Sequence, residues 1–272
     1  RVTGLDSLKT LNDLKSLLSS AIRGVKGVDQ KSFKKGVADL DIRLQGSADA
    51  FAGELDGKAV SRFKLKVTGI TANTLEDWTL RLWDFDSSSV GALPQGFVVG
   101  TLFDGRPAGE WKVIETKAAP SPPHVLAQLL NKGAEHAYKI VLVEGTTAMD
   151  VDLEVSVLAV AGRGDMGGGL IWRAQDERNY YLTRANPLEQ NIRLYRVAKG
   201  VRQQLANFNQ IIPTRRWHAL RVVVRGNHFQ VMFDGEPALD IHDPTFISGR
   251  VGLWTKSDAV TYFDDLRLLV LK

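Results

Sequence analysis

The stretch WHALRVVVRGNHFQVMFDGEPALDI, residues 217–241, decides the fold class of most of this chain. Its first part alternates apolar and polar residues, which places Leu220, Val222 and Val224 on one face of a strand. Farther on, Asp234 and Gly235 stand between two further strand-like runs and are typical of a two-residue β-hairpin turn. The stretch therefore predicts consecutive antiparallel strands with one face in a hydrophobic core.

Similar short runs recur through residues 84–272, separated by turn residues at intervals of about 8–12 positions. They include DVDLEVSVLAV at 150–160, GGGLIWRAQ at 167–175, NYYLTRA at 179–185, IRLYRVAKG at 192–200, GRVGLWTK at 249–256 and TYFDDLRLLVL at 261–271. The segment HVLAQLLNKGAEH at 124–136 is the only helix candidate here, and it fits a strand and loop equally well. This pattern predicts an all-β antiparallel sandwich or jelly roll.

Residues 1–83 have a different pattern. An amphipathic helix is predicted by the apolar stripe of Leu8, Leu11, Leu14, Leu18 and Ile22. Strands are predicted around residue 2 and at 37–44, 62–70 and 73–83, with a second helix at 47–55. This order resembles the ferredoxin-like βαββαβ modules of bacterial envelope proteins. Because DFDSSSVGALPQG at 84–96 is turn-rich, we expect an α+β ferredoxin-like domain at 1–83 and a β-sandwich at 84–272.

Charge and composition exclude several function classes. Residues 1–83 hold 14 Lys and Arg against 10 Asp and Glu, while residues 84–272 hold 21 of each. A neutral larger domain argues against nucleic-acid binding, which depends on phosphate neutralisation. The absence of Cys excludes disulfides and thiolate sites, and no apolar run has the length of a transmembrane segment.

The order of four segments in the second half carries a family resemblance. These are GLIWRAQDERNYYLTRA at 169–185, RLYRVAKGVRQQLA at 193–206, the stretch quoted first, and SGRVGLWTKSDAVTYFDDLRL at 248–268. The set resembles concanavalin A-like jelly rolls, in particular the laminin-G-like, keto-disaccharide-hydrolase-like and family-sixteen-glycosidase-like domains of exported bacterial proteins. The resemblance implies a periplasmic or cell-surface location, but the fold hosts lectins, hydrolases and assembly domains alike.

A saccharide site is predicted on three consecutive strands of one sheet. Its side chains offer guanidinium groups, an amide and an aromatic face, which suit sugar hydroxyls and ring faces. The candidate ligand-binding residues are Arg173, Arg184, Asn186, Arg193 and Tyr195. The alternative is that these aromatic and Arg side chains only stabilise the sheet by pairing across strands.

No motif for catalysis is recognised. Retaining glycosidases of this fold carry E-x-D-x-x-E, which is absent, as is the G-x-S-x-G of serine hydrolases. Asp150, Asp152 and Glu154 share one strand face, but their i, i+2, i+4 spacing and apolar neighbours favour a solvated face of an outer strand. None of the five His lies at a local metal-ligand spacing such as H-x-x-x-H.

One metal site is implied by the resemblance. In several jelly rolls of this class an Asp near the start of the final strand binds a structural calcium, and Asp264 in YFDDLRLLVL matches it. The DFD segment at 84–86 would then lie beside Asp264. The alternative is that Asp264 and Asp265 end a turn and pair with Arg267 or solvent.

Together these observations favour a non-catalytic binding or assembly module of an exported bacterial protein, with a saccharide or an envelope protein as its partner. Two alternatives stay open. The first is a sugar-active hydrolase of the keto-disaccharide-hydrolase type. The second is an extrinsic structural subunit of a membrane-associated complex, in which sheet edges would make the protein contacts.

Overall fold

A computed structural model describes residues 42–43, 66–67, 78–100 and 108–271. The chain divides into two compact units, Arg1–Asp77 and Trp78–Lys272. In the first unit the described residues are two short antiparallel strands, β1 (Ile42–Arg43) and β2 (Lys66–Val67). The predicted helix with Leu8 and Leu11 lies outside the described residues. The predicted division at residue 83 stays a prediction.

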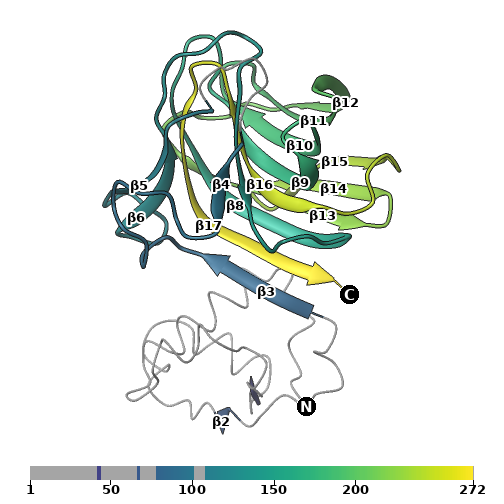
Figure 1. Cartoon of the computed structure of the whole chain (residues 1–272), viewed down its shortest axis with the longest axis horizontal. Coiled ribbons are helices and arrows are strands. Elements are labelled where there is room, and N and C mark those ends of the chain that lie inside the picture. The colour runs from purple at the N-terminus through teal and green to yellow at the C-terminus, as the bar shows by residue number, and fades with distance from the viewer. Residues whose placement is uncertain (1–41, 44–65, 68–77, 101–107, 272) are drawn as a thin grey trace. The chain divides into compact units, whose positions relative to one another are not determined.

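The second unit is a sandwich of two antiparallel sheets (Figure 1). The seven-stranded sheet has the order β12-β11-β10-β9-β16-β7-β4. Its strands are β4 (Phe97–Val99), β7 (Tyr138–Val143), β9 (Gly168–Asp176), β10 (Asn179–Asn186), β11 (Asn191–Ala198), β12 (Val201–Asn209) and β16 (Arg250–Lys256).

The eight-stranded sheet has the order β15-β14-β13-β8-β17-β6-β5, with one further strand, β3, paired to β17. Its strands are β3 (Trp78–Trp83), β5 (Trp111–Glu115), β6 (His124–Gln128), β8 (Asp150–Ala161), β13 (Trp217–Arg225), β14 (His228–Phe233), β15 (Glu236–His242) and β17 (Val260–Leu271). Strand β17 pairs with β8 along one side, and with β6 and then β3 along the other.

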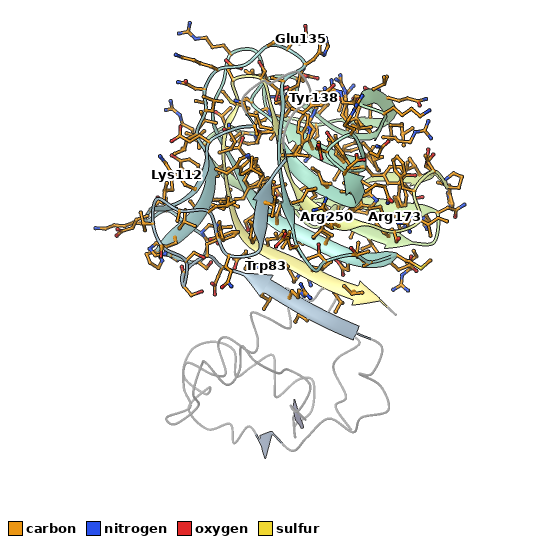
Figure 2. The ribbon with its side chains drawn as sticks, viewed as in Figure 1. Trp83, Lys112, Glu135, Tyr138, Arg173 and Arg250 are labelled. Carbon is orange, nitrogen blue, oxygen red and sulfur yellow. The ribbon has the colours of Figure 1, made fainter. Side chains whose placement is uncertain are left out.

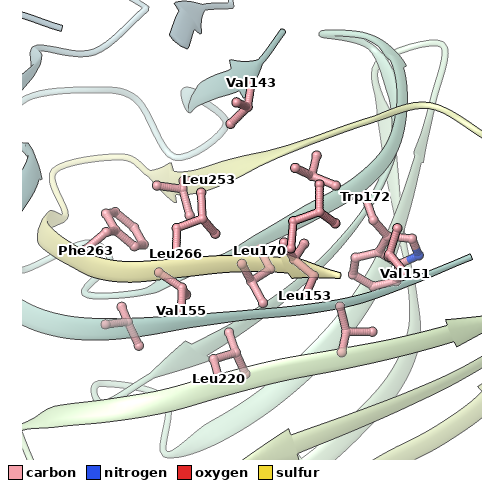
Figure 3. Close-up of a cluster of buried hydrophobic side chains, with 14 of the residues drawn as sticks. Val143, Val151, Leu153, Val155, Leu170, Trp172, Leu220, Leu253, Phe263 and Leu266 are labelled. Carbon is pink, nitrogen blue, oxygen red and sulfur yellow. The ribbon is translucent and has the colours of Figure 1, made fainter. Parts of the chain in front are cut away.

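Apolar side chains from the facing sides of both sheets fill the core (Figure 3). Leu220, Val222 and Val224 of β13 are all fully buried, as the alternating pattern predicts. From the other sheet, Leu170 and Trp172 of β9 pack into the same cluster. Each such side chain contributes about 1.5–3 kcal/mol on burial, so the alternation of apolar and polar residues along the strands stabilises the sandwich.

The predicted hairpin turn is confirmed. Asp234 and Gly235 join β14 to β15, and both have positive φ angles, 51° and 86°. Two consecutive positive φ values are the requirement of the tight hairpin turn that matches the twist of the flanking strands. The turn therefore fixes the pairs beside it, and a one-residue shift between Val231 and Met232 sets the pairs farther along β14 and β15.

The predicted α+β fold class is wrong: every element of the described residues is a strand, and these strands form antiparallel sheets. The helix candidate at 124–136 begins instead with strand β6. The strand assigned to the end of a ferredoxin-like order, β3, pairs with β17 from Leu266 to Leu271. Local alternation predicts a strand but carries no information on its pairing partner, which only the tertiary structure decides.

Strand β8 also differs from its predicted environment. Val151, Leu153 and Val155 face the core as expected, but Asp152 and Glu154 on the other face are buried as well. The reason is that β8 is a central strand between β13 and β17.

Basic side chains on the neighbouring strands accompany these two acids. Arg221 of β13 forms a bidentate pair with Asp152, at 2.7 Å and 2.5 Å, and Arg267 of β17 pairs with Glu154. The acidic face is therefore a structural ion-pair network.

Within the part of the chain that the structure describes, there is no helix with the length and apolar character of a membrane span.

Candidate functional site

The outer face of the seven-stranded sheet carries a second buried cluster, on the side away from the core. Outer faces of antiparallel sheets are usually solvated and polar. Here the cluster is aromatic and aliphatic, and comprises Tyr138, Ile140, Leu142, Ile171, Ala174, Tyr180, Leu182, Tyr195, Val197 and Trp254. This face therefore carries a packed cluster of side chains that is separate from the core between the sheets.

The guanidinium group of Arg202 lies over three aromatic rings of this cluster. The Cζ atom of Arg202 on β12 stands 4.4 Å from the ring centroid of Tyr195. The same atom is 5.3 Å from the ring of Tyr138 and 5.9 Å from that of Trp254. Cation–π attraction of this kind holds the guanidinium group against the aromatic surface while leaving its edge available for hydrogen bonds.

Arg184 of β10 is the buried centre of an adjoining polar cluster, with only 1% of its surface exposed. Its Nη1 atom donates to the carbonyl oxygen and side-chain oxygen of Asn191, at 3.1 Å and 2.5 Å. Its Nη2 atom donates to Glu189 at 3.0 Å and to the hydroxyl of Tyr195 at 3.2 Å. These bonds hold Arg184 in one orientation and turn Glu189 toward it.

Arg193 of β11 completes the cluster at its surface. Its Nη1 atom donates to the same Glu189 oxygen at 2.5 Å, and its Nε atom donates to Asn207 at 2.8 Å. Side-chain exposure is 29% for Arg193 and 35% for Glu189, whereas Tyr195 is only 4% exposed. Glu189 and Arg193 are therefore the members of the cluster that a ligand can reach.

Asn186 holds the loop that presents Glu189. Its side-chain oxygen accepts hydrogen bonds from the backbone N–H groups of Leu188 and Glu189, at 2.9 Å and 3.3 Å. An Asn side chain that satisfies the backbone N–H two residues on is the usual way to fix such a turn. Asn186, which is fully buried, therefore fixes the position of the loop that carries Glu189.

The electrostatics of the cluster keep Glu189 ionised. Burial raises the pKa of Glu189, but the adjacent Arg184 and Arg193 outweigh it and hold the pKa below its ordinary value. Asp165, which lies 3.8 Å from Lys256, is affected in the opposite direction. Its burial raises its pKa against the lowering effect of the Gly167 N–H group and of nearby Arg184 and Lys256.

The structure brings four of the five predicted ligand residues together: Arg184, Asn186, Arg193 and Tyr195. The fifth, Arg173 on β9, lies elsewhere (Figure 2). Its guanidinium group donates to the carbonyl oxygens of Met149, Phe246 and Gly226, and it is 3% exposed. Arg173 therefore ties loops at one end of the sandwich together.

Asp264 is fully buried next to an irregularity in the pairing between β17 and β8, which falls between Asp264 and Arg267. Its Oδ2 atom accepts a hydrogen bond from the backbone N–H of Ser121 at 2.9 Å, and its Oδ1 atom accepts one from the N–H of Asp265 at 2.7 Å. Burial raises its pKa to about 7, against the lowering effect of the Ser121 N–H group. Calcium would have to compete with these donors, and calcium binding by Asp264 stays a prediction.

The segment predicted beside Asp264 has partners of its own. The Oδ1 atom of Asp86 accepts a hydrogen bond from the backbone N–H of His124 at 3.3 Å. Asp84 in turn accepts one from the N–H of Asp86 at 3.2 Å. A shared ligand set for DFD and Asp264 therefore also stays a prediction.

Sequence reasoning missed Glu189 and Arg202. Glu189 lies in the loop between two predicted strands, and loops carry function more often than strands do. Its position between two strands that each supply an Arg was a usable signal. Arg202 had no such signal, because only the tertiary structure brings it over aromatic rings from β7, β11 and β16.

The comparisons with known proteins agree with this fold. Residues 99–269 match the family model of the 3-keto-alpha-glucoside-1,2-lyase-like domain. The levanase of Bacillus subtilis (strain 168) is 23% identical over 128 residues, a match that covers 46% of this chain. The chain spans only 18% of that levanase.

Among solved structures, the carbohydrate-binding module CBM66 from Bacillus subtilis matches with a TM-score of 0.52 and 19% identity. The match covers 63% of this chain and 94% of that module, and it shows a shared fold. The keto-disaccharide-hydrolase-like resemblance expected from the sequence is confirmed by the family model. Since that model covers more than half of the residues, the chain belongs to the family of 3-keto-alpha-glucoside-1,2-lyase-like domains.

Proposed function

We propose that the second unit binds a saccharide on the outer face of its seven-stranded sheet, around Glu189, Arg193 and Arg202. The observation that carries this proposal is the pre-arranged cluster in which buried Arg184 and Tyr195 fix two reachable charged groups. Sugar hydroxyls bind best to donors and acceptors that are already held in place, because little side-chain entropy is then lost.

The buried aromatic rings beside the cluster act indirectly, because they hold the guanidinium group of Arg202 in place. Tyr195 carries the guanidinium group of Arg202 on its face, so the charged and aromatic surfaces adjoin. Ligand sites typically combine an apolar or aromatic floor with a few fixed polar groups. The hydroxyls of a pyranose or furanose unit suit a guanidinium group that is held in this way.

The related proteins support the same substrate class. One is named a levanase, one a carbohydrate-binding module, and the family itself is named for a keto-glucoside. These names describe the other proteins. For this chain, both the binding of a saccharide and the identity of that saccharide are proposals. Export to the periplasm or cell surface would bring the site to such polysaccharides and remains part of the proposal. A protein partner in the envelope stays a prediction.

Binding without catalysis is the role we favour, because the reachable groups of the cluster are paired with one another. The family name favours a second candidate, elimination or hydrolysis of a 3-keto-glucoside. In such a reaction a base abstracts a proton next to the keto group. Among the site's carboxyls, Glu189 is held ionised at neutral pH by two guanidinium groups and is a weak base, which counts against this candidate.

The test is saccharide binding by the full chain, measured by titration calorimetry and affinity electrophoresis on a panel that includes levan. Arg193→Ala should weaken binding about tenfold or more, since a charge-assisted hydrogen bond is worth about 1.5–3 kcal/mol. Arg225→Ala is the matched control, because this exposed Arg lies on the other sheet. Equal binding by both variants, or no saccharide bound by the unmodified chain, would reject the site.

The catalytic candidate is checked on the same samples. A 3-keto-glucoside is incubated with the protein, and released products are followed by chromatography. If the unmodified chain turns over the 3-keto-glucoside and Glu189→Gln does not, the protein is an enzyme and the non-catalytic role is rejected. Binding without turnover supports the role proposed here.

A further inference from the structure

A group of three potential metal ligands lies on the hairpin formed by β14 and β15, at the edge of the eight-stranded sheet. It consists of His228, Asp240 and His242. Each residue offers one ligand atom, and these atoms all lie within 4.8 Å of one another. In the part of the chain that the structure describes, no other cluster of three His, Asp or Glu side chains has such a geometry.

Strand geometry produces this cluster. Asp240 and His242 are two residues apart on β15, so their side chains project from the same face of the sheet. His228 on β14 is the cross-strand partner of His242, and Gln230 is the partner of Asp240. The Asp234-Gly235 turn and a one-residue register shift between Val231 and Met232 together set this pairing, so the three side chains gather without any contribution from a distant segment.

The side chains are already in contact. The imidazole rings of His228 and His242 stack with their centroids 4.4 Å apart and only 7° between their planes. The Nε2 atom of His228 lies 2.6 Å from Oδ1 of Asp240. Gln230 donates from Nε2 to the other oxygen of Asp240 at 3.0 Å, which orients the carboxylate.

We propose that His228, Asp240 and His242 bind a divalent transition-metal ion of the zinc type. Two imidazole nitrogens and one carboxylate oxygen are the donors that Zn²⁺ prefers, and three protein ligands leave one position for water. In a tetrahedral site with bonds of about 2.0–2.1 Å, the ligand atoms stand about 3.4 Å apart.

Metal binding would therefore bring the widest-spaced ligand atoms, now within 4.8 Å, closer by up to about 1.4 Å, and would separate the 2.6 Å pair of His228 and Asp240 by about 0.8 Å. The side chains of the cluster can rotate to allow this, because His228 is 32% exposed and Asp240 is 59% exposed. In the metal-bound form the ion takes the place of the proton between His228 and Asp240, and that proton moves to Nδ1 of His228 or to solvent. Gln230 would then act as a positioning residue, holding the bound carboxylate through its second oxygen.

This site is independent of the proposed saccharide site. Its three residues lie on β14 and β15 of the eight-stranded sheet, whereas Glu189, Arg193 and Arg202 belong to the β10–β12 region of the other sheet. Loss of one site leaves the other in place, so the two proposals succeed or fail separately.

The test is a zinc titration of the full chain, prepared without a histidine tag and treated with EDTA. Competition with a chromophoric chelator should give one bound Zn²⁺ per chain. His242→Gln, His228→Gln and Asp240→Asn should each lower the affinity about tenfold or more, as expected for loss of a ligand. His136→Gln is the matched control, because His136 is exposed and lies outside the cluster.

Cobalt substitution supplies a second readout. Co²⁺ bound in the cluster should give a visible absorption band that the His242→Gln chain lacks. Circular dichroism confirms that each variant is folded, which is expected because the three side chains are at the surface. Absence of stoichiometric zinc binding, or equal affinity in His242→Gln and His136→Gln, would overturn the proposal.

Discussion

At the scale of single residues, two arginines of one cluster have opposite roles. Arg184 is 1% exposed and satisfies Asn191, Glu189 and Tyr195 at once. Arg193 is 29% exposed and shares Glu189 with Arg184. A buried guanidinium group that holds its neighbours contributes to stability, whereas a reachable one contributes to recognition. The structural alternative therefore fits Arg184, while recognition through Arg193 belongs to the proposed saccharide site.

Replacing the buried arginine should cost stability. Arg184→Ala leaves a cavity and removes charge-assisted hydrogen bonds, which we expect to lower the free energy of unfolding by about 2–4 kcal/mol. Arg193→Ala should change it by less than about 1 kcal/mol, because its ion pair with Glu189 is partly solvated. Urea denaturation followed by fluorescence measures both. Equal losses in the two variants would contradict this division of roles.

Asp264 should make stability depend on pH. Its pKa of about 7 in the folded state exceeds the ordinary value of 3.8, so folding favours the protonated carboxyl. The resulting stabilisation is fully present below pH of about 4 and is lost as the pH rises through about 7. Between pH 5 and pH 8.5, the melting temperature of the unmodified chain should therefore fall more than that of Asp264→Asn.

Parallel melting profiles of the two proteins would show that Asp264 does not titrate in this range. The same measurement in EDTA and in millimolar calcium tests the calcium prediction. A ligand that binds only the folded chain raises its melting temperature by mass action. An increment seen in the unmodified protein and lost in Asp264→Asn would support a calcium site.

At the scale of elements, strand pairing assembles both proposed sites. The β10–β11 hairpin places Arg184 opposite Arg193, with Glu189 in the loop between them. The β14–β15 hairpin places His228 opposite His242. A short turn sets the register of β10–β11, a turn and a one-residue shift set that of β14–β15, and the register decides which side chains face each other. Strand β3 has a different role, because it covers one side of β17 where β6 ends.

Removal of β3 should destabilise the sandwich. A fragment of residues 84–272 lacks β3 and leaves the backbone of β17 from Leu266 to Leu271 unpaired on that side. We expect it to melt below a fragment of residues 78–272, by about 2–4 °C for each kcal/mol lost. Calorimetry of both fragments gives the comparison, with the far-ultraviolet spectrum as a check for β structure. Identical melting temperatures would mean that β3 is dispensable.

At the scale of the whole molecule, the sandwich presents its proposed sites on different sheets. Its core lies between the two sheets, so the outer faces are free to carry function without loss of the main hydrophobic cluster. The seven-stranded sheet has the buried aromatic and arginine surface on its outer side. The eight-stranded sheet has a network of buried ion pairs near its centre and the histidine cluster at its edge.

The sequence by itself determined the strands of the sandwich and the face that each turns to the core. Leu220, Val222 and Val224 alternate with polar residues, and a period of two specifies both the strand and its buried side. Asp234 and Gly235 determined a tight turn, because few residues accept positive φ angles at two successive positions. Such signals are local, so the sequence predicts these features without the structure.

Only the tertiary structure decided which strands are neighbours, and with that the environment of each polar side chain. The sequence favours a solvated face for Asp152 and Glu154, but neighbouring strands bury them beside Arg221 and Arg267. Arg184 and Glu189 became a cluster only when β10 and β11 paired, and His228 met His242 only across a hairpin. Strands β13 and β17, which bury Asp152 and Glu154, are far from β8 in the chain, so their pairing depends on the packing of the whole sandwich and not on any one segment.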